Sequence, residues 1–295
     1  MKTYRKFLNF FMLFLSSLMA LYGIFWLLWI LGNLFINGFK YLKPELVYLD
    51  PTPPGMEGGG LRPAFVGHFI ITSLATLIGV PIGIMAGVYF SEYGKESTFF
   101  KVLRQITDIM VSTPSIIMGA VVYALLVKPL GHFNGFSGAV ALALLMVPVI
   151  AVTTDEMLKL VPQQMREAAY ALGAYKWQVI KDVVFRAAKV GILTGVILGV
   201  ARIAGETAPL LFTAFNNTFL NLNLLKPMAS LTVTMFNYVM GPYHYWHEQA
   251  WASAFILTMG VLILSIIAKL LLHGNLLKPL SYIARSFAKK NKEEI

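Results

Sequence analysis

The chain reads Gly-Val-Ala-Arg-Ile-Ala-Gly-Glu-Thr-Ala-Pro-Leu-Leu-Phe-Thr over residues 199–213, and this stretch places two charges inside an apolar segment. The segment runs from about Lys189 to Phe215, which is long enough to cross a membrane as a helix. Arg202 would lie about 20 Å along that helix, too deep to reach the headgroups easily. An arginine at that depth costs at least about 2.5–3.5 kcal/mol. Glu206, four residues further on, is the partner that the spacing predicts.

The composition indicates a protein whose solvent is lipid. Of the 295 residues, 57% are hydrophobic and only 13% are charged, whereas soluble domains carry about 25% charged residues. The chain has no cysteine, which excludes disulfides and thiolate metal sites, and we expect no metal site. The net charge of +10 comes from basic residues scattered between apolar segments, which argues against a nucleic-acid surface.

Six apolar segments are long enough to cross the core of a bilayer, which needs roughly 20 helical residues. They run near 10–35, 64–90, 106–130, 136–158, 189–215 and 250–272. Most of the Lys and Arg residues lie in the loops on one side, so the positive-inside rule places both termini in the cytoplasm. The sequence therefore predicts an all-α, multi-pass integral membrane protein with six transmembrane helices.

The same pattern divides the chain into three regions. Residues 1–63 hold the first transmembrane helix and an outward loop rich in Pro and Gly, which is expected to lack regular structure. Residues 64–275 form the main transmembrane domain, with a cytoplasmic loop at 162–188. Residues 276–295 form a basic cytoplasmic tail.

The cytoplasmic loop differs from the others because it is amphipathic and helix-forming. Pro162 favours a helix start, and Gly173 favours a left-handed helix end. A second helical pattern follows, with Trp177, Ile180 and Val184 on one face. Two short helices with a glycine elbow would lie along the membrane surface. They would serve either as a plain interfacial hairpin or as a docking element for a partner.

Glu167-Ala168-Ala169 followed by Gly173 resembles the EAA motif of the permease subunits of ABC importers. In that family the loop forms a coupling helix that docks in a groove of a separate ATPase subunit. The family motif ends in Ile-x-Leu-Pro, and Arg186 stands here in place of the proline. The chain has no Walker A pattern, so ATP and Mg would be used by the partner, and no cofactor is expected on this chain. The residues so implied in ATPase coupling are Glu167, Ala168, Ala169, Gly173 and Trp177.

A longer match extends this resemblance. The stretch Ala201–Ala214, with Glu167–Gly173 before it, is similar to the PstA-type permeases of bacterial phosphate importers. The resemblance implies type I ABC importer architecture, inorganic phosphate as substrate and no catalytic residue. It also implies a place in the bacterial inner membrane. The implied partners are a PstC-type homologous permease, a PstB-type ATPase dimer and a PstS-type phosphate-binding protein.

Arg202 is the leading candidate for contact with the anion, because a guanidinium presents a planar fork of donors that matches phosphate oxygens. Glu206 would orient this fork. The alternative is that the pair only fixes the helix register. Phosphonate, sulfate or molybdate import remains open as a second function, and a membrane-embedded enzyme or scaffold as a third. The candidate substrate-binding residues are Arg202, Glu206, Thr207 and Ser115.

Three further residues carry expectations about the spans. Asp108 is expected at the positive N-terminal end of the third span, and Pro114 is expected to kink that helix. Asp155 is expected at a solvated cytoplasmic end of the fourth span.

Overall fold

The computed structural model describes residues 2–94 and 97–272, which contain helices and no strand. Five helical spans there are long and apolar enough to cross a membrane. They are α1 (Lys2–Lys40), α3 (Arg62–Glu92), α7 (Gly135–Lys159), the run of α9 (Lys176–Gln178), η2 (Val179–Val184) and α10 (Phe185–Ala204), and α13 (His244–Leu272). A bent pair of segments gives a sixth span if it is counted as one, because α4 (Thr98–Ser112) meets α5 (Ser115–Val122) at a bend of 112°. Beyond α5 this span continues through η1 (Tyr123–Val127) and α6 (Lys128–Leu130).

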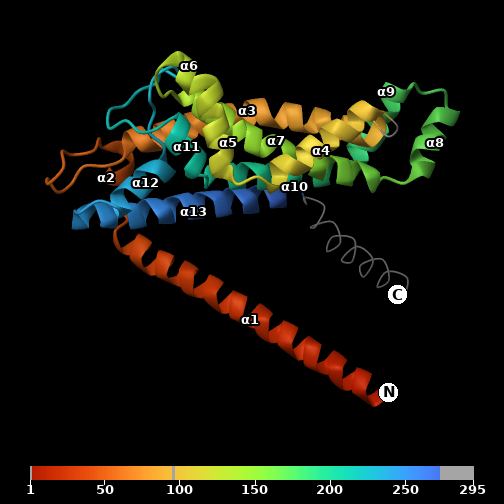
Figure 1. Cartoon of the computed structure of the whole chain (residues 1–295), viewed down its shortest axis with the longest axis horizontal. Helices are drawn as coiled ribbons and strands as arrows, with labels where there is room; N and C mark the ends of the chain where they lie inside the picture. The colour runs from red at the N-terminus through yellow and green to blue at the C-terminus, as the bar shows by residue number, and fades with distance from the viewer. Residues whose placement is uncertain (1, 95–96, 273–295) are drawn as a thin grey trace, which may run out of the picture.

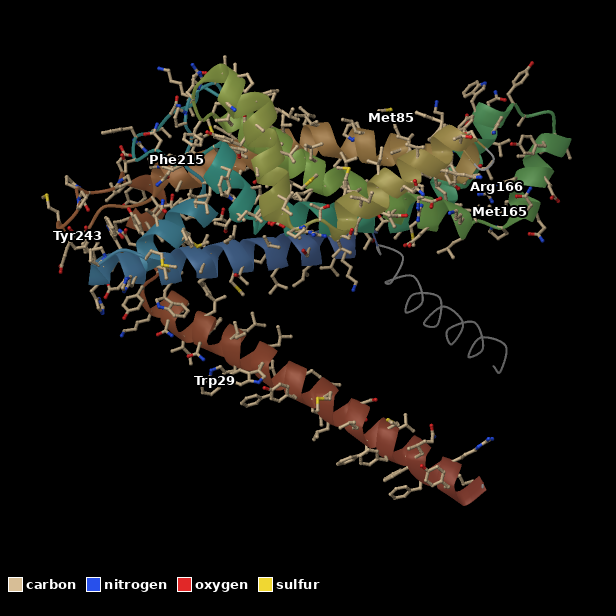
Figure 2. The ribbon with its side chains drawn as sticks, viewed as in Figure 1. Trp29, Met85, Met165, Arg166, Phe215 and Tyr243 are labelled. Carbon is tan, nitrogen blue, oxygen red and sulfur yellow. The ribbon has the colours of Figure 1, made fainter. Side chains whose placement is uncertain are left out.

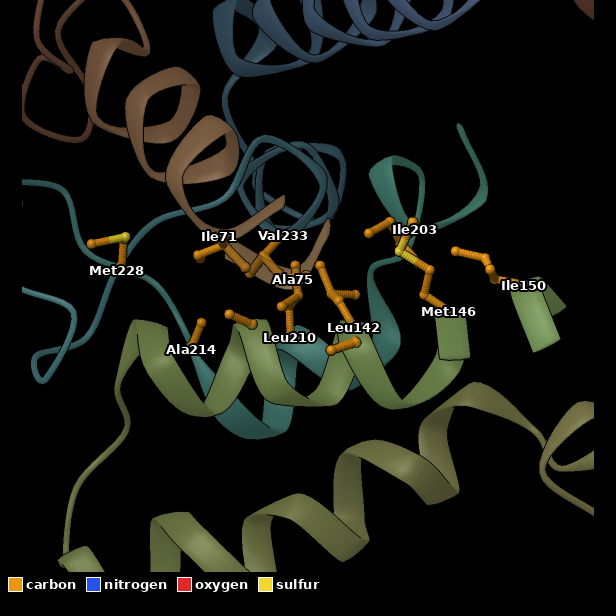
Figure 3. Packing of buried hydrophobic residues seen from close by; sticks show 12 residues of the cluster. Ile71, Ala75, Leu142, Met146, Ile150, Ile203, Leu210, Ala214, Met228 and Val233 are labelled. Atoms are coloured by element: carbon orange, nitrogen blue, oxygen red, sulfur yellow. The ribbon is translucent and has the colours of Figure 1, made fainter. Parts of the chain in front are cut away.

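Helix α7 forms the centre of the bundle, with α3 and α10 packed along it (Figures 1 and 3). Lipid offers little hydrophobic driving force between helices, so close packing has to supply the contact energy. Glycines on α3 allow this approach, since a Cβ at Gly83 would lie 2.7 Å from Cβ of Ile150. Ile71, Met146 and Ile150 belong to the buried cluster that holds these helices together.

The third span breaks at Thr113 and Pro114, which is a larger change than the predicted kink. Proline has no N–H and clashes with the preceding turn, so α4 ends before it. The hydroxyl of Thr113 donates to the carbonyl of Ile109 over 2.7 Å, which satisfies an orphan acceptor at the helix end. Ser97 caps the start of α4 by accepting from Phe100 N. Asp108 therefore lies inside α4, and its predicted place at the helix N-terminus is wrong.

Two of the loops between spans contain a short helix, and for the Pro/Gly-rich loop this is more regular structure than the sequence predicts. The Pro/Gly-rich loop contains a one-turn helix, α2 (Glu45–Tyr48), and Arg62 closes it with hydrogen bonds of 3.0 and 2.6 Å to the Asp50 carboxylate. The second loop contains α12 (Leu231–Val239). Helix α13 begins at His244 rather than near Ala250. Backbone groups in these loops pair locally instead of remaining open to water.

Helix α1 leaves the bundle, as Figure 1 shows, and its side chains are largely exposed. It meets α13 near Phe35 and Phe39, whose rings lie against Phe255. The N-terminal end of α1 and the helix α8 (Gln163–Ala171) point toward the same end of the long axis. The placement of both termini in the cytoplasm stays a prediction. The predicted tail at 276–295 lies outside the described residues.

Candidate functional site

The fifth span is interrupted where the sequence predicts a continuous helix over 189–215. Helix α10 ends at Ala204, and α11 (Ala208–Thr213) resumes beyond a short turn. The Pro209 ring would clash with the carbonyl of Gly205 in an unbroken helix, which accounts for the end of α10. The turn closes with a 3.2 Å hydrogen bond from Glu206 N to the carbonyl of Ile203. The two candidate charges therefore flank a helix end.

This turn lies opposite the middle of α7. A Cβ at Gly199 would meet Ile150 and Met146 at 3.4 and 3.5 Å, and one at Gly138 would meet Ala214 at 2.8 Å. Helices α10 and α11 thus follow α7 in the opposite direction along most of its length. Arg202 consequently lies near mid-depth of the bundle, although it belongs to the last turn of α10.

The Arg202–Glu206 pair is open rather than tightly closed. The Nε of Arg202 lies 3.9 Å from Oε1 of Glu206, which is too long for a hydrogen bond. The Arg202 side chain is 49% exposed and that of Glu206 is 18% exposed. A cation in the last turn of a helix is favoured by the helix dipole. The guanidinium is thus held near Glu206 while its donors remain accessible.

Thr207 begins the next segment and borders a cavity of about 590 Å³. Thr232 and His247 border the same cavity, together with apolar residues of α12 and α13. The Thr232 hydroxyl donates to the carbonyl of Glu206 over 3.0 Å, so α12 fixes the turn that carries the acidic residue. Sequence reasoning missed Thr232, since nothing in a single sequence links it to a residue in another segment.

Ser115 is the first residue of α5, and α5 packs against α11. A Cβ at Gly119 would lie only 2.6 Å from Cα of Pro209, so the two backbones approach closely. The breaks in the third and fifth spans are therefore joined through α5 and α11. Within the described residues, no hydrogen bond joins Ser115 to Arg202 or Glu206.

Replacing Gly119 with alanine is expected to destabilise the protein by about 1–3 kcal/mol, the usual cost of overpacking. The added methyl group would push α5 away from the Pro209 backbone. Thermal unfolding in detergent measures the effect. Gly23→Ala is the matched control, because a Cβ there meets no atom within 4 Å. Equal unfolding temperatures for the two variants would contradict the close-packed junction.

Helix α8 lies at one end of the bundle, and most of its residues are exposed (Figure 2). It ends in the predicted left-handed glycine, Gly173, whose φ is +82°. The N–H of Gly173 bonds to the carbonyl of Tyr170 over 2.9 Å, and Ala174 N bonds to the carbonyl of Ala169 over 3.1 Å. These two bonds form a Schellman motif. Leu172 is left 89% exposed at the tip.

The EAA residues divide between the two sides of α8. Glu167 and Ala168 are exposed, while Ala169 is half-buried against the cluster that contains Leu158 and Val184. One face of the helix is thus available for a partner, and the other is seated on the bundle.

The second half of the predicted hairpin is not a separate surface helix. Residues from Lys176 onward run directly into α10 as one 29-residue span. Ile180 and Val184 are buried, but Trp177 is 57% exposed and does not lie on the face that the sequence predicts for all three. A π-helical stretch, η2, separates Trp177 from Val184 and shifts the helical register between them.

Two buried ionic contacts at the end of the bundle that carries α8 were not predicted. Asp155 is fully buried and accepts from Arg104 and Lys159 over 2.6 and 2.7 Å, so the expected solvated end is wrong. Arg166 pairs with Glu92 over 3.0 Å. The i,i+4 spacing of Asp155 and Lys159 was visible in the sequence, but Arg104 and Glu92 come from other helices. Over the described part of the chain, no group of three His, Asp or Glu side chains is arranged to hold a metal.

The family model and the relatives that match this chain agree on one family. Residues 79–274 match the model of the binding-protein-dependent transport system inner membrane component. The phosphate transport system permease protein PstA of Haemophilus influenzae is 50% identical over 240 residues, covering 81% of this chain and 85% of the relative. The protein of the same name from Yersinia pestis is 49% identical and covers 74% of each chain. The probable PstA of Methanocaldococcus jannaschii is 40% identical over 68% of this chain and 72% of its own.

Solved structures share the fold at low sequence identity. A chain of a bacterial alginate ABC transporter, in complex with a periplasmic protein bound to an alginate pentasaccharide, aligns with a TM-score of 0.61 and 16% identity. This match covers 86% of the present chain and 92% of that one. A chain of the inward-facing MetNI methionine ABC transporter aligns with a TM-score of 0.56 and 17% identity, covering 72% and 92%. The chain belongs to the inner membrane components of binding-protein-dependent transport systems, and within them to the PstA permease proteins.

Proposed function

We propose that this chain is a permease subunit of an ATP-driven importer of inorganic phosphate and forms half of the translocation pathway. It is a transport component rather than an enzyme, like the PstA relatives it matches. The observation that supports an anion pathway is the break in the fifth span. That break sets the accessible Arg202 guanidinium at mid-depth, at the end of a helix. Interrupted membrane helices are a recurring way to build substrate sites in transporters.

Arg202 is the proposed phosphate contact. Its planar fork donates two parallel hydrogen bonds to an oxyanion, and its charge persists at every physiological pH. Glu206, 3.9 Å away, orients the fork without saturating its donors. Its negative charge also weakens anion retention, which a transporter needs in order to release its cargo. Thr207 and Ser115 are proposed to add hydroxyl hydrogen bonds from the neighbouring helix starts.

The partners follow from what the chain provides. One wall of a pathway needs a second permease to close it, which we propose is a PstC-type homologue in the bacterial inner membrane. A PstB-type ATPase dimer would bind ATP and Mg, and this chain would bind no cofactor. A PstS-type binding protein would deliver phosphate from outside. Glu167, Ala168, Ala169, Gly173 and Trp177 are the proposed docking residues for the ATPase.

Reconstitution of the assembled complex in liposomes tests this function. Labelled phosphate should accumulate inside only when ATP and the binding protein are supplied on their proper sides. A hundredfold excess of unlabelled sulfate, molybdate or phosphonate should leave phosphate uptake unchanged. Uptake that one of these anions suppresses as strongly as unlabelled phosphate would identify a different oxyanion as substrate. Uptake without ATP would contradict the ATP-driven mechanism.

A further inference from the structure

One side chain of α8 points into the bundle and joins three helices. Arg166 lies in the first turn of α8, and its Nη2 donates over 3.0 Å to Oε1 of Glu92, the last residue of α3. The same Nη2 donates to the carbonyl of Leu158 over 2.9 Å, and Nη1 donates to the carbonyl of Val161 over 2.5 Å. Leu158 lies in the last turn of α7 and Val161 just beyond it. The guanidinium therefore ties the start of α8 to the ends of α3 and α7.

The burial of this contact distinguishes it from the next ion pair along the chain, Arg186–Asp182. The side chains of Arg166 and Glu92 are 12% and 10% exposed. The neighbouring Arg186–Asp182 pair is 74% and 45% exposed and lies within a single helix. Exposed pairs contribute little, whereas a buried charged pair that loses one partner leaves the other uncompensated. Ser91 also donates to Oε1 of Glu92 over 3.0 Å, which fixes the carboxylate that Arg166 meets.

Arg166 and Glu167 are adjacent but have opposite surroundings. Arg166 is largely buried against α3 and α7, while Glu167 is exposed on α8. Helices α3 and α7 are also the most extensively packed pair in the bundle. A displacement of α8 by a partner thus reaches the bundle core through the Arg166 contacts and through the apolar seat of Ala169.

We infer that Arg166 is the positioning residue that transmits movement of α8 to α3 and α7, with Glu92 as its acceptor. This role rests on the proposed function, in which an ATPase moves α8. Without this Arg166–Glu92 bridge, the ATPase still docks on the exposed face of α8 and hydrolyses ATP. The displacement of α8 then reaches the bundle only through the apolar seat of Ala169, so most of the coupling between hydrolysis and transport is lost.

The test compares Arg166→Gln and Glu92→Gln with Arg186→Gln in the complete reconstituted complex. Phosphate transported per ATP hydrolysed is measured together with the ATPase rate stimulated by the binding protein. Arg166→Gln is expected to lower the transport ratio by at least about tenfold, within the usual range of coupling between sites. The ATPase rate should stay within about twofold of wild type. Arg186→Gln, which removes an exposed pair on one helix, should leave both quantities unchanged.

The double variant provides a readout that general destabilisation does not give. If Arg166 and Glu92 act through one bridge, the double variant transports no less per ATP than Arg166→Gln alone, because coupled residues are not additive. An unchanged ratio in Arg166→Gln, or additive losses in the double variant, would overturn the inference. If the complex with Arg166→Gln fails to assemble, Glu92→Gln alone tests the inference. A wild-type amount of phosphate transported per ATP in Glu92→Gln would contradict the Arg166–Glu92 bridge. A wild-type complex that imports no phosphate would instead contradict the proposed function.

Discussion

Replacing Arg202 with glutamine should lower phosphate uptake by at least about 10- to 100-fold while the complex still assembles. Hydrogen bonds to charged groups contribute about 1.5–3 kcal/mol each, and each 1.4 kcal/mol corresponds to a factor of ten. Glutamine keeps a donor but loses the charge and the fork. Because Arg202 is 49% exposed and makes only a 3.9 Å contact with Glu206, its loss should disturb packing little. Initial rates of labelled phosphate uptake in liposomes measure the effect.

Arg62→Gln is the matched control for that experiment. Arg62 also pairs with a carboxylate, but it closes an outward loop onto Asp50 and lies far along the chain from the interrupted spans. Phosphate uptake by the Arg62→Gln variant should stay near that of wild type. Wild-type uptake in Arg202→Gln would exclude a role in anion contact. A variant that loses assembly or thermal stability but keeps its phosphate affinity would favour the register-fixing alternative for the Arg202–Glu206 pair.

The second large effect is expected at the EAA helix. Glu167→Lys should leave the permease in the membrane but reduce co-purification of the ATPase by at least about tenfold. A reversed charge at a docked surface meets repulsion as well as a lost partner. Glu167 is exposed on α8, so the change should not disturb the permease itself. Quantitative co-purification with a tagged permease measures the outcome.

A deletion variant and a control variant accompany the Glu167→Lys experiment. Deletion of residues 163–173 should abolish ATPase retention entirely, because it removes both α8 and the exposed Leu172 tip. Glu57→Lys makes the same charge change in the outward loop and should retain the ATPase. A stable ATPase that co-purifies with the deletion variant would contradict the coupling role of α8.

Several features were predictable because they depend on local sequence. Each membrane span needs a run of apolar residues, so the apolar segments and most of their centres were visible in the sequence. The left-handed end of α8 followed from Gly173, since glycine alone adopts a φ of +82° without strain. The proximity of Arg202 and Glu206 followed from their spacing, although they turned out to flank a helix end.

Other features depend on distant segments and on backbone geometry that hydropathy does not register. An apolar run reads the same whether it is one helix or two half-helices, so the break after Ala204 was missed. Gly205 and Pro209 around Glu206 were the available signal, as Gly/Pro-interrupted hydrophobic segments often mark transporter sites. The buried contacts of Asp155 and Arg166 required knowledge of which helices meet, which a single sequence does not contain.

A structure of the assembled complex with phosphate bound tests the central claim most directly. The account predicts phosphate at the break in the fifth span, with its oxygens within about 3 Å of the Arg202 guanidinium nitrogens. Glu206 should then lie beside the guanidinium and not against the anion. Phosphate held elsewhere, with Arg202 engaged only by Glu206 or by the partner permease, would contradict it.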